Sequence, residues 1–250
     1  MENTILITGA NNGIGFHMTQ SLLAAGDRVG AVDLCDDNLI PLQSTYPDRL
    51  MVFPCDVTDP VQIQAAVTTL LERWGQVDVL VNNACLLYYQ SFEDKPVADT
   101  RREFEVNYFG CLNTIAAVLP YMKARGKGII HNLSSGVGIT GFPGISGYAS
   151  TKGAIESLTR TLALEFEKYG IVVNLMHPPL TNTKSAAPLG IPVQVMDDPA
   201  RVGRSLAKQI LSTKPIISTD LRSAIFLFIS YRYPRMIGKL FARITADSTK

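Results

Sequence analysis

Residues 4–15, with the sequence TILITGANNGIG, join a short apolar run to a glycine-rich loop and the start of an amphipathic stretch. The apolar residues 4–9 predict a buried strand, and residues 13–25 predict a helix. Glycines in the loop allow a tight turn and close approach of a diphosphate, whose charge the free N–H groups of the helix N-terminus can bind. The spacing is G-x-x-x-G-x-G, without the Gly-Lys-Ser/Thr of a P-loop. A plain strand-to-helix turn is the alternative interpretation.

The same alternation of apolar runs and amphipathic stretches continues along the chain. Further strands are predicted at 28–33, 50–56, 77–84, 128–135, 171–177 and 214–219. Helices are predicted at 39–45, 60–74, 98–124 and 148–169. Because the strands are nearly continuous apolar runs, both faces of the sheet should be covered. The pattern predicts one α/β domain over 1–250, a doubly wound parallel sheet of about seven strands flanked by helices. Dinucleotides bind at the first crossover of such a sheet.

Composition excludes several classes of protein. The 250 residues are 46% hydrophobic and 18% charged with a net charge of +1, as in an ordinary globular protein, and nothing points to nucleic acid. The N-terminus lacks a basic region and a long apolar run, and no window of about 18 apolar residues suggests a membrane span. The four cysteines lie 20 to 30 positions apart and the three histidines are scattered, so we expect no metal site. Reduced thiols in a cytoplasmic protein are the expectation.

Two carboxylates end predicted strands near the expected dinucleotide site. Asp33 lies about twenty residues beyond the loop, where a carboxylate accepts both hydroxyls of an adenosine ribose and repels a 2′-phosphate. No arginine or lysine occurs in the loop or just after Asp33, so NAD(H) is predicted over NADP(H). Asp56, followed by Val57, is placed to meet the adenine ring. The alternative for Asp56 is a helix cap.

Six short motifs, in this order and spacing, resemble the short-chain dehydrogenase/reductase family in its single-domain branch. They read TGANNGIG, CDVTD, VNNA, FEVNYFG, NLSS and YASTK, and the resemblance covers about residues 4–183. The resemblance implies a Rossmann-like fold. Together with the loop and the carboxylates, it implies cofactor contacts at Gly9, Asn11, Asn12, Gly13, Ile14, Gly15, Asp33, Asp56, Val57, Asn83, Ala84, Tyr148, Lys152 and Thr183. The chain departs from the family at Cys85, where a glycine is usual.

Tyr148 and Lys152 lie four positions apart, so they share one face of the predicted helix. Taken alone, the pair also suits an ordinary wet helix face. The resemblance makes it the family's active-site pair and adds Ser135 and Asn107 as the other catalytic residues. A free tyrosine has a pKa of about 10, and lowering it by three units takes roughly 4 kcal/mol of preferential phenolate stabilisation. Lys152 and an oxidised nicotinamide ring can both contribute.

In the implied mechanism Tyr148 is the acid/base, Ser135 orients the substrate oxygen, Lys152 also holds the nicotinamide ribose, and Asn107 anchors a proton-relay water. The expected activity is NAD-dependent interconversion of a secondary alcohol and a ketone. Two alternatives remain open: a dinucleotide-binding sensor or scaffold without turnover, and an NADP-dependent carbonyl reductase. A sensor has no need of the full catalytic set.

The substrate is expected to be lipophilic. Residues 184–213 are interpreted as a substrate lid, which is poor in charge toward its middle, and residues 86–89 add an apolar wall. Neither segment identifies the substrate or the direction of the reaction.

The C-terminal residues 220–246 differ from the commonest members of the family and predict atypical amphipathic helices. Beyond Pro234 the apolar residues at helical spacing are Met236, Ile237, Leu240, Phe241 and Ile244, and the basic ones are Arg235, Lys239 and Arg243. Such a helix can dock on its own domain, on a sister subunit, or on a membrane surface as a peripheral contact. The resemblance also implies a homodimer or homotetramer that pairs through helices 98–124 and 148–169.

Overall fold

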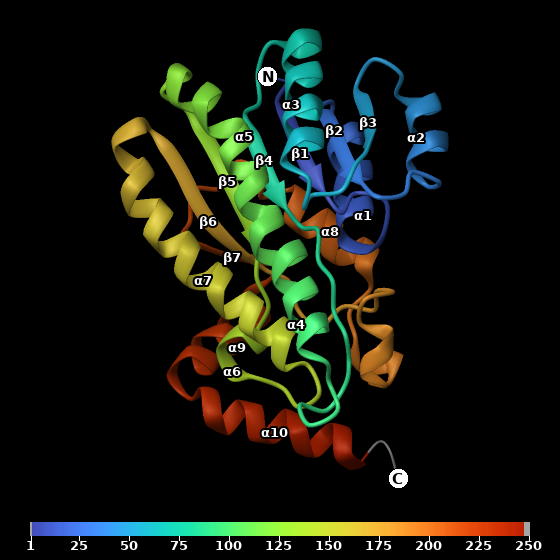
Figure 1. The fold of residues 1–250 in the computed structure, drawn as a ribbon, viewed down its shortest axis with the longest axis vertical. Helices are drawn as coiled ribbons and strands as arrows, with labels where there is room; N and C mark the ends of the chain where they lie inside the picture. Colours follow the sequence, from blue (N-terminus) through green and yellow to red (C-terminus); the bar gives the residue numbers. More distant parts are fainter. Residues whose placement is uncertain (1, 248–250) are drawn as a thin grey trace.

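Seven parallel strands form one sheet in the order β3-β2-β1-β4-β5-β6-β7 (Figure 1). The computed structural model describes the backbone of residues 2–247 and the side chains of residues 2–243. The strands are β1 (Thr4–Thr8), β2 (Arg28–Asp33), β3 (Leu50–Pro54), β4 (Val79–Asn82), β5 (Gly128–Leu133), β6 (Ile171–His177) and β7 (Ile216–Ser218). This is the predicted doubly wound α/β sheet. Chain order reverses between β1 and β4, which is the switch point where such sheets bind ligands.

Each face of the sheet has its own layer of helices (Figure 1). One layer contains α1 (Gly13–Ala24), α2 (Leu39–Thr45) and α8 (Pro199–Ala207), and the other contains α3 (Pro60–Trp74), α5 (Gly110–Arg125) and α7 (Ser146–Phe166). In β1, Ile5 and Ile7 pack in the apolar cluster beneath α1, α2 and α8, whereas Leu6 packs in the cluster beneath α3, α5 and α7. All three side chains are fully buried. Apolar residues on both faces explain the continuous apolar runs in the strands.

The region predicted as one helix, 98–124, forms two α-helices joined by a π-helical turn. Residues Val97–Phe104 form α4, residues Glu105–Phe109 form a π-helical turn, and α5 follows. The spacing of apolar residues does not predict the π-helical turn. Within this turn, Asn107 makes hydrogen bonds to residues far away in the sequence. The short helix α6 (Val137–Thr140), directly after β5, also has no apolar period to predict it.

The expected lid, 184–213, has two unlike parts. Residues 184–198 contain two short 3₁₀ turns, Ala187–Leu189 and Val193–Val195. Beyond them, α8 packs tightly on α1: a Cβ added to Gly203 would lie 2.6 Å from the Cβ of His17. Val202 and Leu206 are fully buried. Because α8 is part of the core, the lid prediction is wrong for α8, and for residues 184–198 it stays a prediction.

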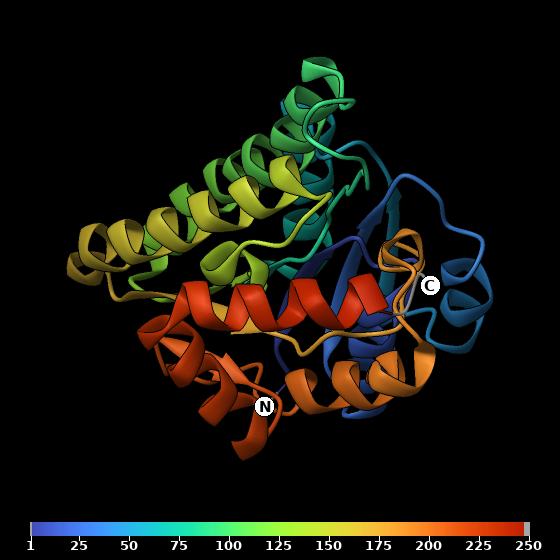
Figure 2. The same ribbon diagram turned by 90° about the horizontal axis from the view of Figure 1, so that it is seen from below.

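The C-terminal segment forms α9 (Leu221–Arg232) and α10 (Pro234–Asp247). Asp220 caps α9 by accepting a hydrogen bond from the backbone N–H of Ser223, and Pro234 starts α10, where its missing N–H costs nothing. Seen from below, α10 crosses the end of the molecule at which the strands finish (Figure 2). The side chain of Ile244, assigned to its apolar side, lies outside the described residues.

Candidate active site

The glycine loop is held in shape by the segment after β4. The side-chain amide of Asn83 donates to the carbonyls of Thr8 and Gly9 at 2.9 and 2.8 Å. In return, Thr8 Oγ1 accepts from the backbone N–H groups of Asn83 and Ala84, both at 3.1 Å. A Cβ on Gly15 would lie 2.2 Å from the carbonyl oxygen of Gly9. The loop is therefore fixed by the protein itself, and its third glycine cannot be replaced without moving the backbone.

The N-terminus of α1 is open to an anion. Asn12 precedes the helix in an extended conformation and its side chain makes no capping hydrogen bond, while the first turn carries no acidic residue. Gly13 has φ of +56°, and a Cβ there would lie 3.1 Å from the methyl carbon of Thr183. Ile14 packs on the apolar cluster beneath. A cradle of this kind, without side chains over the helix N–H groups, fits a diphosphate.

Asp33 is bound to the same loop. Its Oδ2 accepts from the backbone N–H of Asn11 at 2.9 Å, and its Oδ1 from that of Cys35 at 3.3 Å. Asn38, which the sequence did not single out, brackets Asn11 by donating its backbone N–H to Asn11 Oδ1 and its side-chain amide to the Asn11 carbonyl. Asn11 Nδ2 is buried without a partner among the described residues. A buried donor left unpaired beside this carboxylate is consistent with a missing ligand.

Asp56 is not a helix cap. Its Oδ1 accepts from the backbone N–H and the hydroxyl of Thr58, and its Oδ2 pairs with Arg102 at 3.2 Å. Burial alone would raise the pKa of Asp56, but these hydrogen bonds and the Arg102 charge outweigh it and lower the pKa. The cap of α3 is Asp59, so the capping alternative for Asp56 is wrong. Val57 is buried against Gly110.

Tyr148 and Lys152 lie on the first turns of α7, and Ser135 follows β5. Lys152 Nζ donates to the carbonyl of Leu133 at 2.8 Å and lies 5.5 Å from the centre of the Tyr148 ring. Burial lowers the pKa of Lys152. Burial also raises the pKa of Tyr148, aided by the nearby Cys85 and Glu103, although a hydrogen bond from Ser135 opposes the rise. In the protein alone Tyr148 is a neutral phenol, so it needs a further positive charge to act as a base.

The side-chain amide of Asn107, predicted to hold a water, already makes three hydrogen bonds within the protein. Its amide N–H groups donate to the Leu86 carbonyl at 2.9 Å and to Thr151 Oγ1 at 3.0 Å. Its Oδ1 accepts from the backbone N–H of Leu86 at 2.6 Å. Thr151 in turn donates to the Tyr148 carbonyl. Asn107 thus ties the segment after β4 to the first turn of α7, and only its remaining lone pair or a backbone carbonyl could hold a water.

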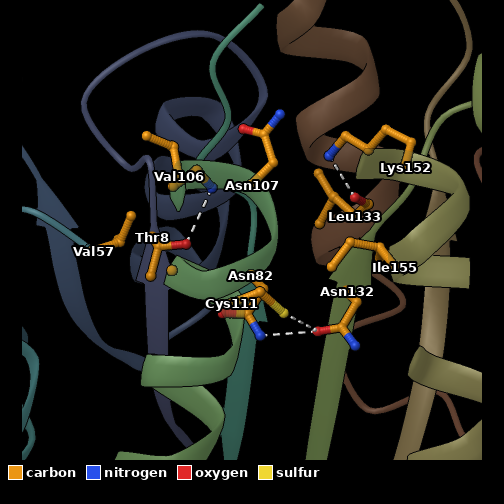
Figure 3. Close-up of a pocket in the computed structure, with 12 residues that line it drawn as sticks. Thr8, Val57, Asn82, Val106, Asn107, Cys111, Asn132, Leu133, Lys152 and Ile155 are labelled. Atoms are coloured by element: carbon orange, nitrogen blue, oxygen red, sulfur yellow. Dashed lines mark hydrogen bonds between the residues drawn. The ribbon is translucent and has the colours of Figure 1, made fainter. Parts of the chain in front are cut away.

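A small pocket with a volume of about 10 Å³ lies between Asn107 and Lys152 (Figure 3). Its lining also includes the polar residues Thr8, Asn82 and Asn132. That volume accommodates about one water molecule, and the polar lining offers the partners that a buried water needs.

One carboxylate that sequence reasoning missed connects the site to the C-terminal helices. Glu156, one turn after Lys152, accepts from Ser134 Oγ at 2.6 Å, His177 Nε2 at 2.8 Å and the hydroxyl of Tyr231. Burial opposes ionisation, yet the hydrogen bonds and charge of His177, with the other donors, lower the pKa of Glu156 to about 2. The i, i+4 spacing from Lys152 was the only sequence signal.

A buried ion pair holds the segment after β4 from its other side. Lys95 Nζ lies 2.6 Å from Glu103 Oε2, and the two side chains are 2% and 0% exposed. Glu103 Oε1 also accepts from the backbone N–H of Tyr88 at 2.9 Å. A Cβ on Gly147 would lie 1.9 Å from Glu103 Oε2, so the carboxylate sits directly against the start of α7, beside Tyr148.

The glycine loop, the switch-point position and the tyrosine–lysine pair agree with a comparison of the sequence with known families. Residues 3–192 match the short chain dehydrogenase family. The chain belongs to that family. It is an oxidoreductase with a Rossmann-like, nucleotide-binding fold.

Similar proteins are found among characterised enzymes and solved structures. The chain is 34% identical over 190 residues to the 2-(R)-hydroxypropyl-CoM dehydrogenase of Xanthobacter autotrophicus, which covers 73% of this chain and 76% of that protein. It is 36% identical over 178 residues to a 3-alpha-(or 20-beta)-hydroxysteroid dehydrogenase of Mycobacterium bovis, covering 71% and 68%. A short-chain dehydrogenase structure from Streptomyces avermitilis superimposes with a TM-score of 0.83 at 30% identity over 99% of both chains. Similarity to that structure includes the C-terminal helices.

No cluster of three or more potential metal ligands occurs among the described residues. All four cysteines are free thiols.

Proposed function

We propose that this chain is an NAD-dependent oxidoreductase that interconverts a lipophilic secondary alcohol and a ketone. The observation that carries the proposal is the convergence of Ser135, Tyr148 and Lys152 beside the preformed glycine loop. Oxidoreduction of an alcohol or ketone agrees with the named activities of the relatives. A bound nicotinamide cofactor would supply the hydride acceptor or donor.

The protein residues handle the proton and the substrate oxygen. In the oxidising direction Tyr148 accepts the hydroxyl proton, and Ser135 donates a hydrogen bond to the substrate oxygen. Lys152 Nζ has two N–H donors beyond its bond to Leu133, and with these it would hold the nicotinamide ribose while keeping its charge near the phenol. The pocket beside Asn107 and Lys152 has room for one water, which would take the proton onward. Thr183 lies next to Gly13, so its side chain would contact a cofactor bound at the loop.

Asp33 sets the preference for NAD(H). Both of its oxygens retain a lone pair after the bonds to Asn11 and Cys35, so the carboxylate can still accept from ribose hydroxyls. A 2′-phosphate would meet this negative charge directly.

Replacing Asp33 with alanine is expected to reverse the preference. The ratio of kcat/KM for NAD(H) to kcat/KM for NADP(H) should fall by about 100-fold. The variant loses the hydrogen bonds from the ribose hydroxyls of NAD(H), and it no longer repels the 2′-phosphate of NADP(H). Steady-state kinetics with both cofactors would measure it, with Asp37→Ala, an exposed acid nearby, as the matched control. An unchanged ratio in Asp33→Ala would show that another residue selects the cofactor.

The substrate site is apolar. The segment after β4 places Leu86, Leu87, Tyr88 and Tyr89 beside the candidate catalytic residues, because Asn107 and Glu103 bind its backbone. A steroid-type relative is consistent with a lipophilic substrate.

A panel of aliphatic, steroidal and prenyl alcohols and ketones should therefore give turnover, followed at the absorbance of NADH. We expect kcat/KM to rise with the apolar surface of the substrate. Highest activity on small polar alcohols would contradict the substrate class. NADH binding without any turnover would favour the sensor alternative.

Assembly and location are proposed from exposed apolar residues and from the free thiols. Exposed apolar residues lie on the helices expected to pair subunits: Phe109, Tyr121 and Leu164. We propose a homodimer through α5 and α7. Four free thiols suit a reducing, cytoplasmic compartment.

A further inference from the structure

The C-terminal helix pair, α9 and α10, is attached to the body of the protein near the candidate active site. The hydroxyl of Tyr231 on α9 binds Glu156 on α7. On α10, a Cβ at Gly238 would lie 2.6 Å from the carbonyl oxygen of Thr140, and Ile237 is buried. Thr140 ends α6, the short helix that follows Ser135. The pair therefore rests on the segments that carry the candidate catalytic residues.

Both helices of the pair expose large apolar side chains. On α9, Leu221, Ile225 and Phe228 lie at i, i+4 and i+7, and Leu221 and Phe228 are 76% and 73% exposed. On α10, Met236 and Leu240 lie at i and i+4, and Leu240 is 53% exposed. Exposed apolar residues gathered on two adjoining helices indicate a surface that binds another surface.

The charge of the helix pair identifies the kind of partner. Residues 221–243 contain five basic residues and no acidic one: Arg222, Arg232, Arg235, Lys239 and Arg243. Because the whole chain has 23 basic and 22 acidic residues, the remaining residues have an excess of four acidic side chains. A second copy of the chain, docked about a two-fold axis, would place two such basic faces against each other. An anionic partner with an apolar interior satisfies both the charges and the exposed apolar side chains.

We propose that the C-terminal helix pair docks on an anionic lipid surface. Leu221, Phe228 and Leu240 enter the boundary between headgroups and acyl chains, while the arginines and Lys239 bind lipid phosphates. The contact is peripheral, because within residues 2–247 no helix has both the length and the apolar character to cross a bilayer.

Docking would place the end of the sheet that carries the candidate site close to the lipid. The helix α10 crosses the end of the sheet at which the strands finish, and it lies against the segment following Ser135 (Figure 2). If the substrate is lipophilic, as the proposed function holds, it reaches the site from the bilayer. Docking itself does not depend on that function.

Vesicle sedimentation of the full-length protein tests the proposal without any turnover. We expect binding to vesicles of phosphatidylcholine with phosphatidylglycerol, release at high salt, and little binding to phosphatidylcholine alone. The charge variant Arg235→Gln/Lys239→Gln/Arg243→Gln should bind about 10- to 100-fold more weakly. The apolar variant Phe228→Ser/Leu240→Ser should also lose binding.

The matched control removes three exposed lysines elsewhere, Lys184→Gln/Lys208→Gln/Lys214→Gln, with the same change in net charge. It should bind like the wild type. Equal loss in this control would show a non-specific charge effect and overturn the proposal, as would equal binding to neutral vesicles or none to either. If the apolar variant instead changes a dimer to a monomer in size-exclusion chromatography and leaves vesicle binding intact, the face is a subunit interface. A variant that has lost affinity for NADH is taken to be misfolded. If Phe228→Ser/Leu240→Ser is misfolded, the single variant Leu240→Ser is tested in its place.

Discussion

Replacing Tyr148 with phenylalanine is expected to lower kcat by about 10²- to 10⁴-fold and to leave the affinity for NADH within a few-fold of wild type. The substitution removes only the phenolic oxygen. Thr151 binds the backbone carbonyl of residue 148, which the change does not touch, and Lys152 binds Leu133. Loss of turnover with retained binding would assign the proton transfer to the phenol. Steady-state kinetics and NADH fluorescence titration measure the two quantities.

The pH dependence gives a second readout for Tyr148. In the protein alone burial holds the Tyr148 pKa above its usual value, so the base form is scarce near neutral pH. Alcohol oxidation by the wild type should therefore rise with pH, because the phenolate fraction rises. The residual activity of Tyr148→Phe should lack that rise. A matched control is Tyr121→Phe, an exposed tyrosine on α5, which should keep both the rate and its pH dependence. Wild-type kcat in Tyr148→Phe would contradict the proposed mechanism.

Breaking the Lys95–Glu103 pair is expected to be strongly destabilising. Either Glu103→Leu or Lys95→Met leaves one charge buried without its partner, and such losses reduce the free energy of unfolding by about 3–5 kcal/mol. Glu103 also accepts a hydrogen bond from the backbone N–H of Tyr88, so replacing Glu103 leaves that N–H without its partner. Urea unfolding followed by circular dichroism would measure the change.

The double variant Lys95→Met/Glu103→Leu separates the pair from its surroundings. With neither charge left, most of the loss should be recovered, because replacing a buried ion pair by apolar side chains is often close to neutral. Arg73→Met, at the exposed pair with Asp48, is the matched control and should cost less than about 1 kcal/mol. Additive losses in the double variant would show that the two charges do not stabilise each other.

The sequence predicted the elements that depend on local pattern. Apolar runs gave the strands, and the glycine loop gave the switch point, since both depend on neighbours within a few residues. The ranges predicted for β2 and β6 match the structure, whereas those for β1, β3, β4, β5 and β7 extend one or two residues into the adjoining loops.

What local pattern cannot reveal is contact between residues far apart in the chain. Tyr231 meets Glu156 across 75 positions, and Asn107 meets Thr151 across 44. The direction of Lys152, toward the Leu133 carbonyl, depends on the packed end of β5. The same limit explains why the core role of α8 was not distinguished from a lid: its burial depends on the position of His17 on α1.

The bonds from Asn83 to the glycine loop also determine when that loop is completed in a growing chain. During synthesis β1, the loop and β2 leave the ribosome before β4, and the amide that holds the carbonyls of Thr8 and Gly9 follows some 75 residues after them. Because β1 pairs with β4 as well as β2, the nascent N-terminal segment has an unpaired strand edge until β4 emerges. The bonds of Asp33 and Asn38 to Asn11 can form earlier, but the carbonyls of Thr8 and Gly9 gain their side-chain partner only after β4 has been translated.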